Sequence, residues 1–183
     1  TGLVGSHVIL KLAQQKKSFK ALKRSSSSLV ICRKIFQYYN VEKLFEEINW
    51  IDGDLNDISS LEYGMKGCDL LVHCAAIVSF SSSDIEDLKK VNIEGTANLM
   101  NVALSLGIKK VGYVSSVASL GRNTTDKIVD EQSFFIPTKN ESNYSLSKYF
   151  SEQEVWRASA EGLDVVIINP SIILGPGDWD KGS

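Results

Sequence analysis

The stretch Val111-Gly112-Tyr113-Val114, followed by Ser115 and Ser116, predicts the class of the fold. It is a short apolar run that contains β-branched residues, and Val165 to Ile168 is a second run of this kind. Such runs are typical of strands covered on both faces, as in a parallel sheet. The carboxyl ends of parallel strands face the ligand crevice, so we expect both serines at a binding site.

Alternating patterns on either side of this run predict an α/β fold with a doubly wound parallel sheet. Further strands are expected at Phe19 to Leu22, Ile48 to Ile51 and Leu70 to Val72. Helical spacing is expected over Leu29 to Glu47 and, most clearly, over Asp84 to Gly107, where apolar residues recur at steps of three and four.

Composition limits the classes of protein that fit. The chain has 183 residues, enough for one domain over 1–183, with 43% hydrophobic residues, 23% charged residues and a net charge of −2. There is no basic excess that would favour nucleic acid. No apolar run reaches the ~20 residues that cross a bilayer, and no secretion signal is evident, so we predict a cytoplasmic location and no membrane partner. The three cysteines lack metal-ligand spacing, so no metal site is predicted.

Two glycines stand where the first helical pattern begins, in Thr1-Gly2-Leu3-Val4-Gly5. Glycines let backbone N–H groups approach a pyrophosphate, which the positive end of a helix then favours. A plain turn explains the same pair equally well.

The end of the predicted strand at Phe19 to Leu22 carries Lys23 and Arg24 rather than an acid. An acidic residue there would suit the ribose 2′-hydroxyl of NAD, whereas a basic residue suits the 2′-phosphate of NADP. A solvated basic surface is the alternative. After the next strand, Asp54-Leu55 could receive the adenine amino group, although the carboxylate could equally cap a helix.

Tyr144 and Lys148 are four residues apart in a helical pattern, so their side chains share one helix face. A neighbouring ammonium lowers the pKa of a phenol, which can then transfer a proton. A surface tyrosine and a solvated lysine are the alternative. Two alanines, Ala75 and Ala76, come directly after the strand stretch that ends with His73 and Cys74, where they leave room for a ligand or for a packed helix; His73 is expected to be structural.

These motifs together resemble the extended short-chain dehydrogenase/reductases. The residues that carry the resemblance, in register along almost the whole chain, are Thr1-Gly2-x-x-Gly5, Asp54-Leu55, His73-x-Ala75-Ala76, Asn92, Ser115-Ser116, Tyr144-x-x-x-Lys148 and Asn169-Pro170-x-x-x-x-Gly175-Pro176-Gly177. Within the superfamily, Val117-Ala118 after the serines differ from the Asp-Glu pair of sugar dehydratases. The sequence looks more like the branch of dihydroflavonol reductases and 3β-hydroxysteroid dehydrogenases.

The resemblance implies a Rossmann-like dinucleotide fold and an oxidoreductase that passes hydride between nicotinamide and a small-molecule carbonyl or alcohol. Tyr144 would be the general acid/base, Lys148 would tune it and hold the ribose, and Ser116 would bind the reacting oxygen. Contacts to NADP, preferred over NAD, are expected from Gly2, Leu3, Val4, Gly5, Lys23, Arg24, Asp54, Leu55, Cys74, Ala75, Ala76, Asn92, Ser115, Tyr144, Lys148, Pro170, Ser171 and Ile172.

Family members also begin with an earlier strand and continue into a substrate-binding region, so the resemblance implies a chain that lacks both. A homodimer through the helix of Asn92 and the helix of Tyr144 is expected. Two alternatives stay open: a nucleotide-sugar epimerase that uses NAD, and a non-catalytic NAD(P)-binding sensor or scaffold.

Overall fold

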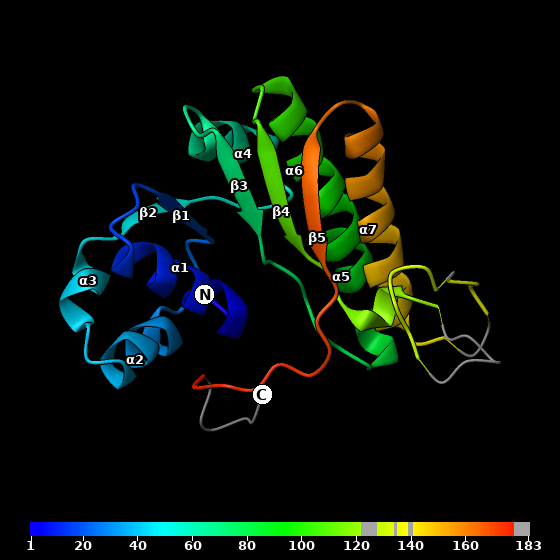
Figure 1. The fold of residues 1–183 in the computed structure, drawn as a ribbon, viewed down its shortest axis with the longest axis horizontal. Coiled ribbons are helices and arrows are strands. Elements are labelled where there is room, and N and C mark those ends of the chain that lie inside the picture. Colours follow the sequence, from blue (N-terminus) through cyan, green and yellow to red (C-terminus); the bar gives the residue numbers. More distant parts are fainter. Residues whose placement is uncertain (122–127, 134, 139–140, 178–183) are drawn as a thin grey trace. The chain divides into compact units, whose positions relative to one another are not determined.

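The computed structural model of the protein describes residues 1–121, 128–133, 135–138 and 141–177 (Figure 1). These residues group into two compact units, one formed by Thr1–Cys68 with residues 172–177 and the other by the described residues between Asp69 and Ser171. Each unit is described by itself.

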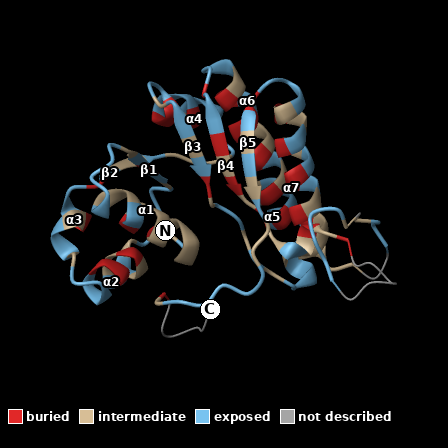
Figure 2. Cartoon of the chain, viewed as in Figure 1, coloured by how far each residue is buried: buried red, intermediate tan, exposed pale blue. Residues whose placement is uncertain are grey.

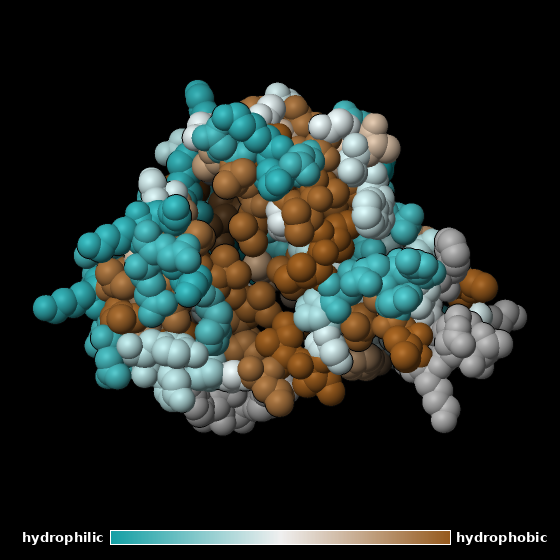
Figure 3. Space-filling view, in the orientation of Figure 1, coloured by the Kyte–Doolittle hydropathy of each residue, from teal (hydrophilic) through white to brown (hydrophobic). Residues whose placement is uncertain are grey.

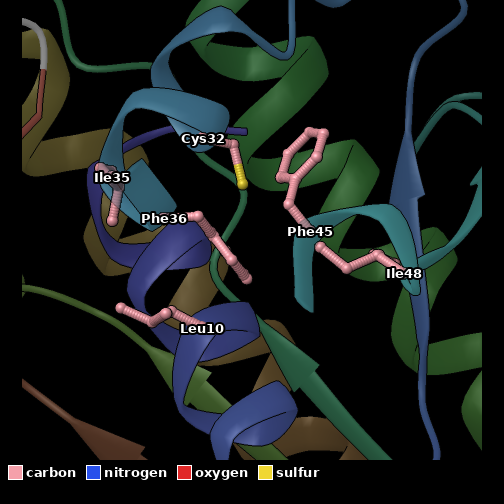
Figure 4. Packing of buried hydrophobic residues seen from close by; sticks show 7 residues of the cluster. Leu10, Cys32, Ile35, Phe36, Phe45 and Ile48 are labelled. Atoms are coloured by element: carbon pink, nitrogen blue, oxygen red, sulfur yellow. The ribbon is translucent and has the colours of Figure 1, made fainter. Parts of the chain in front are cut away.

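The first unit holds a pair of parallel strands among short helices. Its elements are α1 (Leu3–Gln14), β1 (Lys20–Lys23), α2 (Val30–Tyr38), α3 (Glu42–Glu46), β2 (Asn49–Asp52) and α4 (Ile58–Met65). Strand β1 pairs with β2 in parallel, with Lys20 opposite Asn49. Figure 4 shows the apolar side chains from α1, α2 and the α3 region that form the core, which comprises Leu10, Ala21, Cys32, Ile35, Phe36, Phe45 and Ile48.

The range Leu29 to Glu47, where helical spacing is predicted, folds as the two helices α2 and α3, because the chain turns at Asn40. This residue has a φ of 56°, a left-handed conformation that asparagine tolerates better than most residues. The N–H of Val41 then bonds the carbonyl of Phe36 at 3.0 Å and closes the end of α2. The helical spacing predicted for this range is confirmed, and it is divided between α2 and α3.

The second unit is a three-stranded parallel sheet with helices packed against one face (Figure 1). Strand order is β3 (Leu70–His73), β4 (Lys110–Val114) and β5 (Asp164–Ile168). The remaining elements are η1 (Ser82–Asp84), α5 (Ile85–Leu88), η2 (Lys89–Glu94), α6 (Gly95–Ser105), η3 (Val117–Ser119) and α7 (Asn143–Ala160). The predicted parallel pairing of the strand at Val111 to Val114 is confirmed on both of its sides.

The two faces of this sheet differ in burial. Val111 and Tyr113 of β4 are buried, whereas side chains on the neighbouring strands, namely Leu70, Val72, Val166 and Ile168, are at least half exposed (Figure 2). Figure 3 shows brown, apolar atoms over these strands. The prediction that the apolar runs are covered on both faces is therefore wrong for the described part of this unit.

The helix predicted over Asp84 to Gly107 is a succession of α5, the π-helix η2 and α6. Leu99 and Val102 of its apolar stripe are buried, but Ile85 near its start is exposed. The π-helix contains Asn92, and such a widened turn redirects the side chains that follow it. Among the described residues, no helix combines the length and apolarity that a membrane crossing requires.

Candidate functional site

Helix α7 carries both members of the predicted proton-transfer pair. Ser142 caps the helix by accepting a bond from the N–H of Ser145 at 3.0 Å, which fixes its first turn. Tyr144 lies in that turn, half-buried, and its ring meets the exposed ring of Phe80 edge-on at 5.6 Å. Lys148 follows one turn later, as its spacing from Tyr144 predicts.

The ammonium of Lys148 is buried against strand β4. Its Nζ donates to the hydroxyl of Tyr113 at 2.9 Å and to the carbonyl of Val114 at 3.1 Å. An ammonium has three donors, so one N–H is left for a ligand. Burial lowers the pKa of Lys148 to about 8, while the Glu152 carboxylate acts in the opposite direction.

Ser115 and Ser116 at the end of β4 have different hydrogen bonds. Ser115 is buried and donates its hydroxyl hydrogen to Oε2 of Glu152 at 2.5 Å. Ser116 instead accepts a bond from the N–H of Ala118 at 3.1 Å, at the start of η3. Its own O–H has no acceptor among the residues that the structure describes, so it is free to donate to a ligand.

Sequence reasoning missed Glu152, which is buried on α7 and accepts bonds from several segments. Besides Ser115, Ser119 lies with its Oγ at 2.6 Å and Asn169 with its Nδ2 at 2.8 Å from the same carboxylate oxygen. Its spacing of four from Lys148 and eight from Tyr144 places all three on one helix face, which is the signal that could have identified it.

The Asn92 side chain is fully engaged within the protein. Its Oδ1 accepts from the N–H of Ile77 at 2.8 Å, and its Nδ2 donates to the carbonyl of Ile77 at 2.9 Å and to Oγ of Ser147 at 3.0 Å. These bonds tie the segment after β3 to the helix of Lys148. A contact between Asn92 and the cofactor stays a prediction.

The segment after β3 leaves open backbone where the sequence predicts a ligand. Cys74 is half-buried, and Ala75 and Ala76 are exposed. His73 before them is buried and bonds Oγ1 of Thr96 at 2.9 Å; burial, helped by the charge of Lys148, lowers its pKa to about 3. His73 is therefore neutral at physiological pH, in keeping with the structural role expected of it.

In the first unit, Gly2 is the exposed residue that precedes the first turn of α1, formed by Leu3, Val4 and Gly5. A Cβ added at Gly2 would meet no atom within 4 Å, and its φ of −79° is open to any residue. The described packing therefore gives no reason for glycine here. The first turn of α1 has no acidic residue, so no negative side chain within it neutralises the partial positive charge of its N–H groups.

The basic residues after β1 also differ from one another. Lys23 forms an ion pair with Asp52 of β2, whereas Arg24 is exposed and has no side-chain partner among the described residues. Asp54 accepts a bond from the N–H of Asn56 at 2.9 Å, and Leu55 between them is half-buried. Asp54 thus closes a turn through Oδ1, while Asp57 caps α4.

The predicted residues after β5 fall on both sides of the division between the units. Pro170 is half-buried and accepts a bond from the N–H of Val117 at 3.0 Å through its carbonyl, and Ser171 is exposed. Ile172 is exposed and belongs to the first unit. The structure thus brings Ser116, Tyr144, Lys148 and Asn92 into one unit, with Gly2, Arg24 and Asp54 in the other.

Comparison with known proteins identifies the family of the chain. The sequence model of the NAD dependent epimerase/dehydratase family matches residues 1–183. The chain is 37% identical to the "Putative dihydroflavonol 4-reductase" of Synechocystis sp., over 98% of this chain and 48% of that protein. It is 30% identical to sterol demethylase protein B of Methylococcus capsulatus, over 98% of this chain and 51% of that protein.

Among solved structures, the crystal structure of gox2253 is similar with a TM-score of 0.74 and 35% identity, covering 92% of this chain and 48% of the other. The UDP-glucose 4-epimerase of Thermus thermophilus has the same fold, with a TM-score of 0.70 at 21% identity, over 92% of this chain and 51% of that chain. The chain spans about half the length of the curated relatives it matches. With a Rossmann-like fold and a family match over its whole length, the chain belongs to the NAD dependent epimerase/dehydratase family.

Proposed function

We propose that the protein carrying this chain is an NAD(P)-dependent oxidoreductase that interconverts a carbonyl and an alcohol. The observation that carries the proposal is the set formed by Ser116, Tyr144 and Lys148 in one unit. Ser116 has a free O–H donor at a strand end, and Lys148 is a buried cation one helical turn from a half-buried phenol. Such a set can bind a carbonyl oxygen and supply its proton.

Several residues have the properties that a bound dinucleotide would require. The exposed helix start at Gly2 suits a pyrophosphate, because a ligand needing close approach explains a glycine that packing does not. The open backbone at Ala75 and Ala76 and the third N–H of Lys148 suit the nicotinamide half. When bound, the nicotinamide supplies or accepts the hydride.

We assign the cofactor as NADP rather than NAD on the basis of Arg24. It is exposed and has no ion-pair partner among the described residues, so its guanidinium is available for a 2′-phosphate. Lys23 supports this less, because Asp52 already neutralises it. Titration with NADPH and NADH tests the assignment: tighter NADPH binding is expected, and equal or tighter NADH binding would overturn it.

The test of the activity is the Tyr144→Phe substitution in the protein that carries this chain. The names of the relatives suggest three probes: a dihydroflavonol, a steroid ketone and UDP-glucose. On whichever probe the wild type turns over, Tyr144→Phe should lower kcat by about 10² to 10⁴-fold with cofactor affinity nearly unchanged, because a proton transfer is lost.

Tyr149→Phe is the matched control. Tyr149 lies on the same helix, stacked on Phe135 at 4.5 Å, and no hydrogen bond of its hydroxyl is seen within the described residues. It should keep wild-type kcat. Full turnover of Tyr144→Phe would remove the proposed mechanism.

A nucleotide-sugar epimerase is the second candidate, because the chain is 33% identical over 136 residues to the UDP-glucose 4-epimerase of Vibrio cholerae. An epimerase returns the hydride to its substrate, so it consumes no reduced cofactor overall. Conversion of UDP-glucose without net change in absorbance at the nicotinamide band would favour it. Cofactor binding with no turnover of any probe would favour a sensor or scaffold.

A further inference from the structure

Glu152 is a buried carboxylate at the centre of a polar network in the second unit. Three donors, one each from Ser115, Ser119 and Asn169, lie within 2.8 Å of its Oε2, and the indole N–H of Trp156 donates to Oε1 at 3.3 Å. A buried carboxylate is costly unless its oxygens are satisfied in this way. The network therefore fixes the position of the Glu152 side chain.

Two of the donors directly follow strands and precede candidate site residues, and the third, Ser119, is the last residue of η3. Ser115 follows β4 and precedes Ser116, and Asn169 follows β5 and precedes Pro170. Asn169 also approaches the Ser116 carbonyl, at 3.2 Å from its Nδ2. Glu152 thus joins the backbone of Ser116 to α7, the helix that carries Tyr144 and Lys148.

The charge of Glu152 also acts on Lys148, one helical turn earlier. The titratable groups that act on this ammonium are Tyr113 from β4, His73 at the end of β3, Cys74 directly after it, and Glu152 from α7 itself. Tyr144, also on α7, acts on the neighbouring Tyr113. His73 is neutral at physiological pH, and burial raises the pKa values of Tyr113 and Cys74, which keeps both uncharged there. A carboxylate is the partner that can hold a proton on a buried amine.

We propose that Glu152 is a positioning residue for the proposed reaction: its carboxylate holds the Ser116 strand end against α7 and keeps Lys148 as a cation. The inference rests on the proposed function for its catalytic consequence. The effect of Glu152 on the charge of Lys148 can be measured without turnover, so the inference about Glu152 and the proposed function can fail separately.

The test is Glu152→Gln, which keeps the shape of the side chain and removes its charge. The pKa of Lys148 can be measured by NMR on protein with labelled lysine side chains, and the Lys148 signal is identified by its loss in Lys148→Met. This pKa should be near 8 in the wild type and lower by on the order of one unit in Glu152→Gln. Glu154→Gln is the control, because Glu154 pairs with Arg157 and lies outside this network. It should leave the titration of Lys148 unchanged.

The pH dependence of kcat/KM for carbonyl reduction gives a second measurement. In Glu152→Gln, the alkaline side of this profile should move to lower pH by as much as the pKa of Lys148 falls. A purely structural role of Glu152 would instead lower kcat/KM equally at all pH values. If Glu152→Gln does not fold, Glu152→Asp carries the test: it should fold and retain the wild-type Lys148 titration, because it keeps the charge.

An unchanged Lys148 titration in folded Glu152→Gln, or a lowered one in Glu152→Asp, overturns the inference. A lowered pKa of Lys148 in Glu152→Gln, in a protein whose wild type reduces no probe, would instead uphold the electrostatic role and remove the proposed function. The two outcomes are therefore distinguishable.

Discussion

Replacement of Lys148 by methionine should stabilise the fold while removing activity. Lys148 is 2% exposed, and its burial lowers its pKa from 10.5 to about 8. At about 1.4 kcal/mol per unit, that shift corresponds to about 3 kcal/mol of destabilisation at neutral pH, where the amine must be buried as a cation. Methionine is similar in length and is an ordinary core residue.

Part of that gain is offset by lost hydrogen bonds. The Tyr113 hydroxyl keeps Ser151 as its acceptor, but the carbonyl of Val114 loses the Lys148 donor, which costs about 1 kcal/mol. We therefore expect Lys148→Met to raise the free energy of unfolding by about 2 kcal/mol at pH 7, measured by urea unfolding.

The pH dependence follows from the sign of the shift. Because the folded pKa of Lys148 is about 8 and its ordinary value is 10.5, the unfolded chain binds more protons between these pH values. Wild-type stability should thus gain from this group as the pH rises from about 8 to 10.5, and the advantage of Lys148→Met should shrink over the same window. Lys90→Met, at an exposed position, should leave stability within about 0.5 kcal/mol at every pH. A Lys148→Met protein less stable than wild type at pH 7, or an advantage that does not change with pH, would refute the reasoning.

Two further substitutions separate binding from folding. Gly2→Ser places a preferred capping residue before α1 in open space, so we expect thermal stability to be unchanged or higher. The affinity for NADPH, measured by calorimetry, should fall at least about tenfold because the serine side chain obstructs the pyrophosphate. Undiminished affinity would refute the proposal that the pyrophosphate binds at Gly2. Asn92→Ala removes three hydrogen bonds and leaves both polar groups of the Ile77 backbone without their partner, so the free energy of unfolding should fall by about 2 to 4 kcal/mol in urea. A loss below about 1 kcal/mol would show that water replaces the amide.

The strands of the second unit could be predicted from local pattern because each contains a short apolar run. The run at Val111 to Val114 is extended only by Lys110 in the structure, and parallel pairing follows from the helices between the strands. The break at Asn40 was not predicted, because a left-handed residue leaves the helical spacing of its neighbours intact. Exposure of one sheet face was not predictable either, because apolar residues on a strand do not say which elements will cover them.

The placement of Tyr144 and Lys148 on one helix could be predicted, but the hydrogen-bond partners of Lys148 could not. Tyr144 and Lys148 are found by spacing along one helix, and spacing is a property of the sequence. The partners of Lys148 and Glu152 come from β4 and β5, and which hydroxyl meets which carboxylate depends on the register of those strands. The different bonds of Ser115 and Ser116, adjacent and identical in type, show this most clearly.

The buried face of α7 is itself an argument that this helix serves more than folding. Its buried residues include four that are polar or charged, namely Ser147, Lys148, Ser151 and Glu152. Two large apolar residues of the same helix are instead exposed, namely Phe150 and Trp156. A helix selected only to pack would have the opposite pattern, because apolar burial stabilises whereas a buried charge at best recovers the cost of its desolvation. This polar face is tolerated because each of the four residues has a hydrogen-bond partner. Asn92 bonds Ser147, Tyr113 bonds both Lys148 and Ser151, and Ser115 bonds Glu152. A conflict between local pattern and packing, in which hydrogen bonds satisfy the buried polar side chains and one N–H of Lys148 is left over, is expected at functional sites.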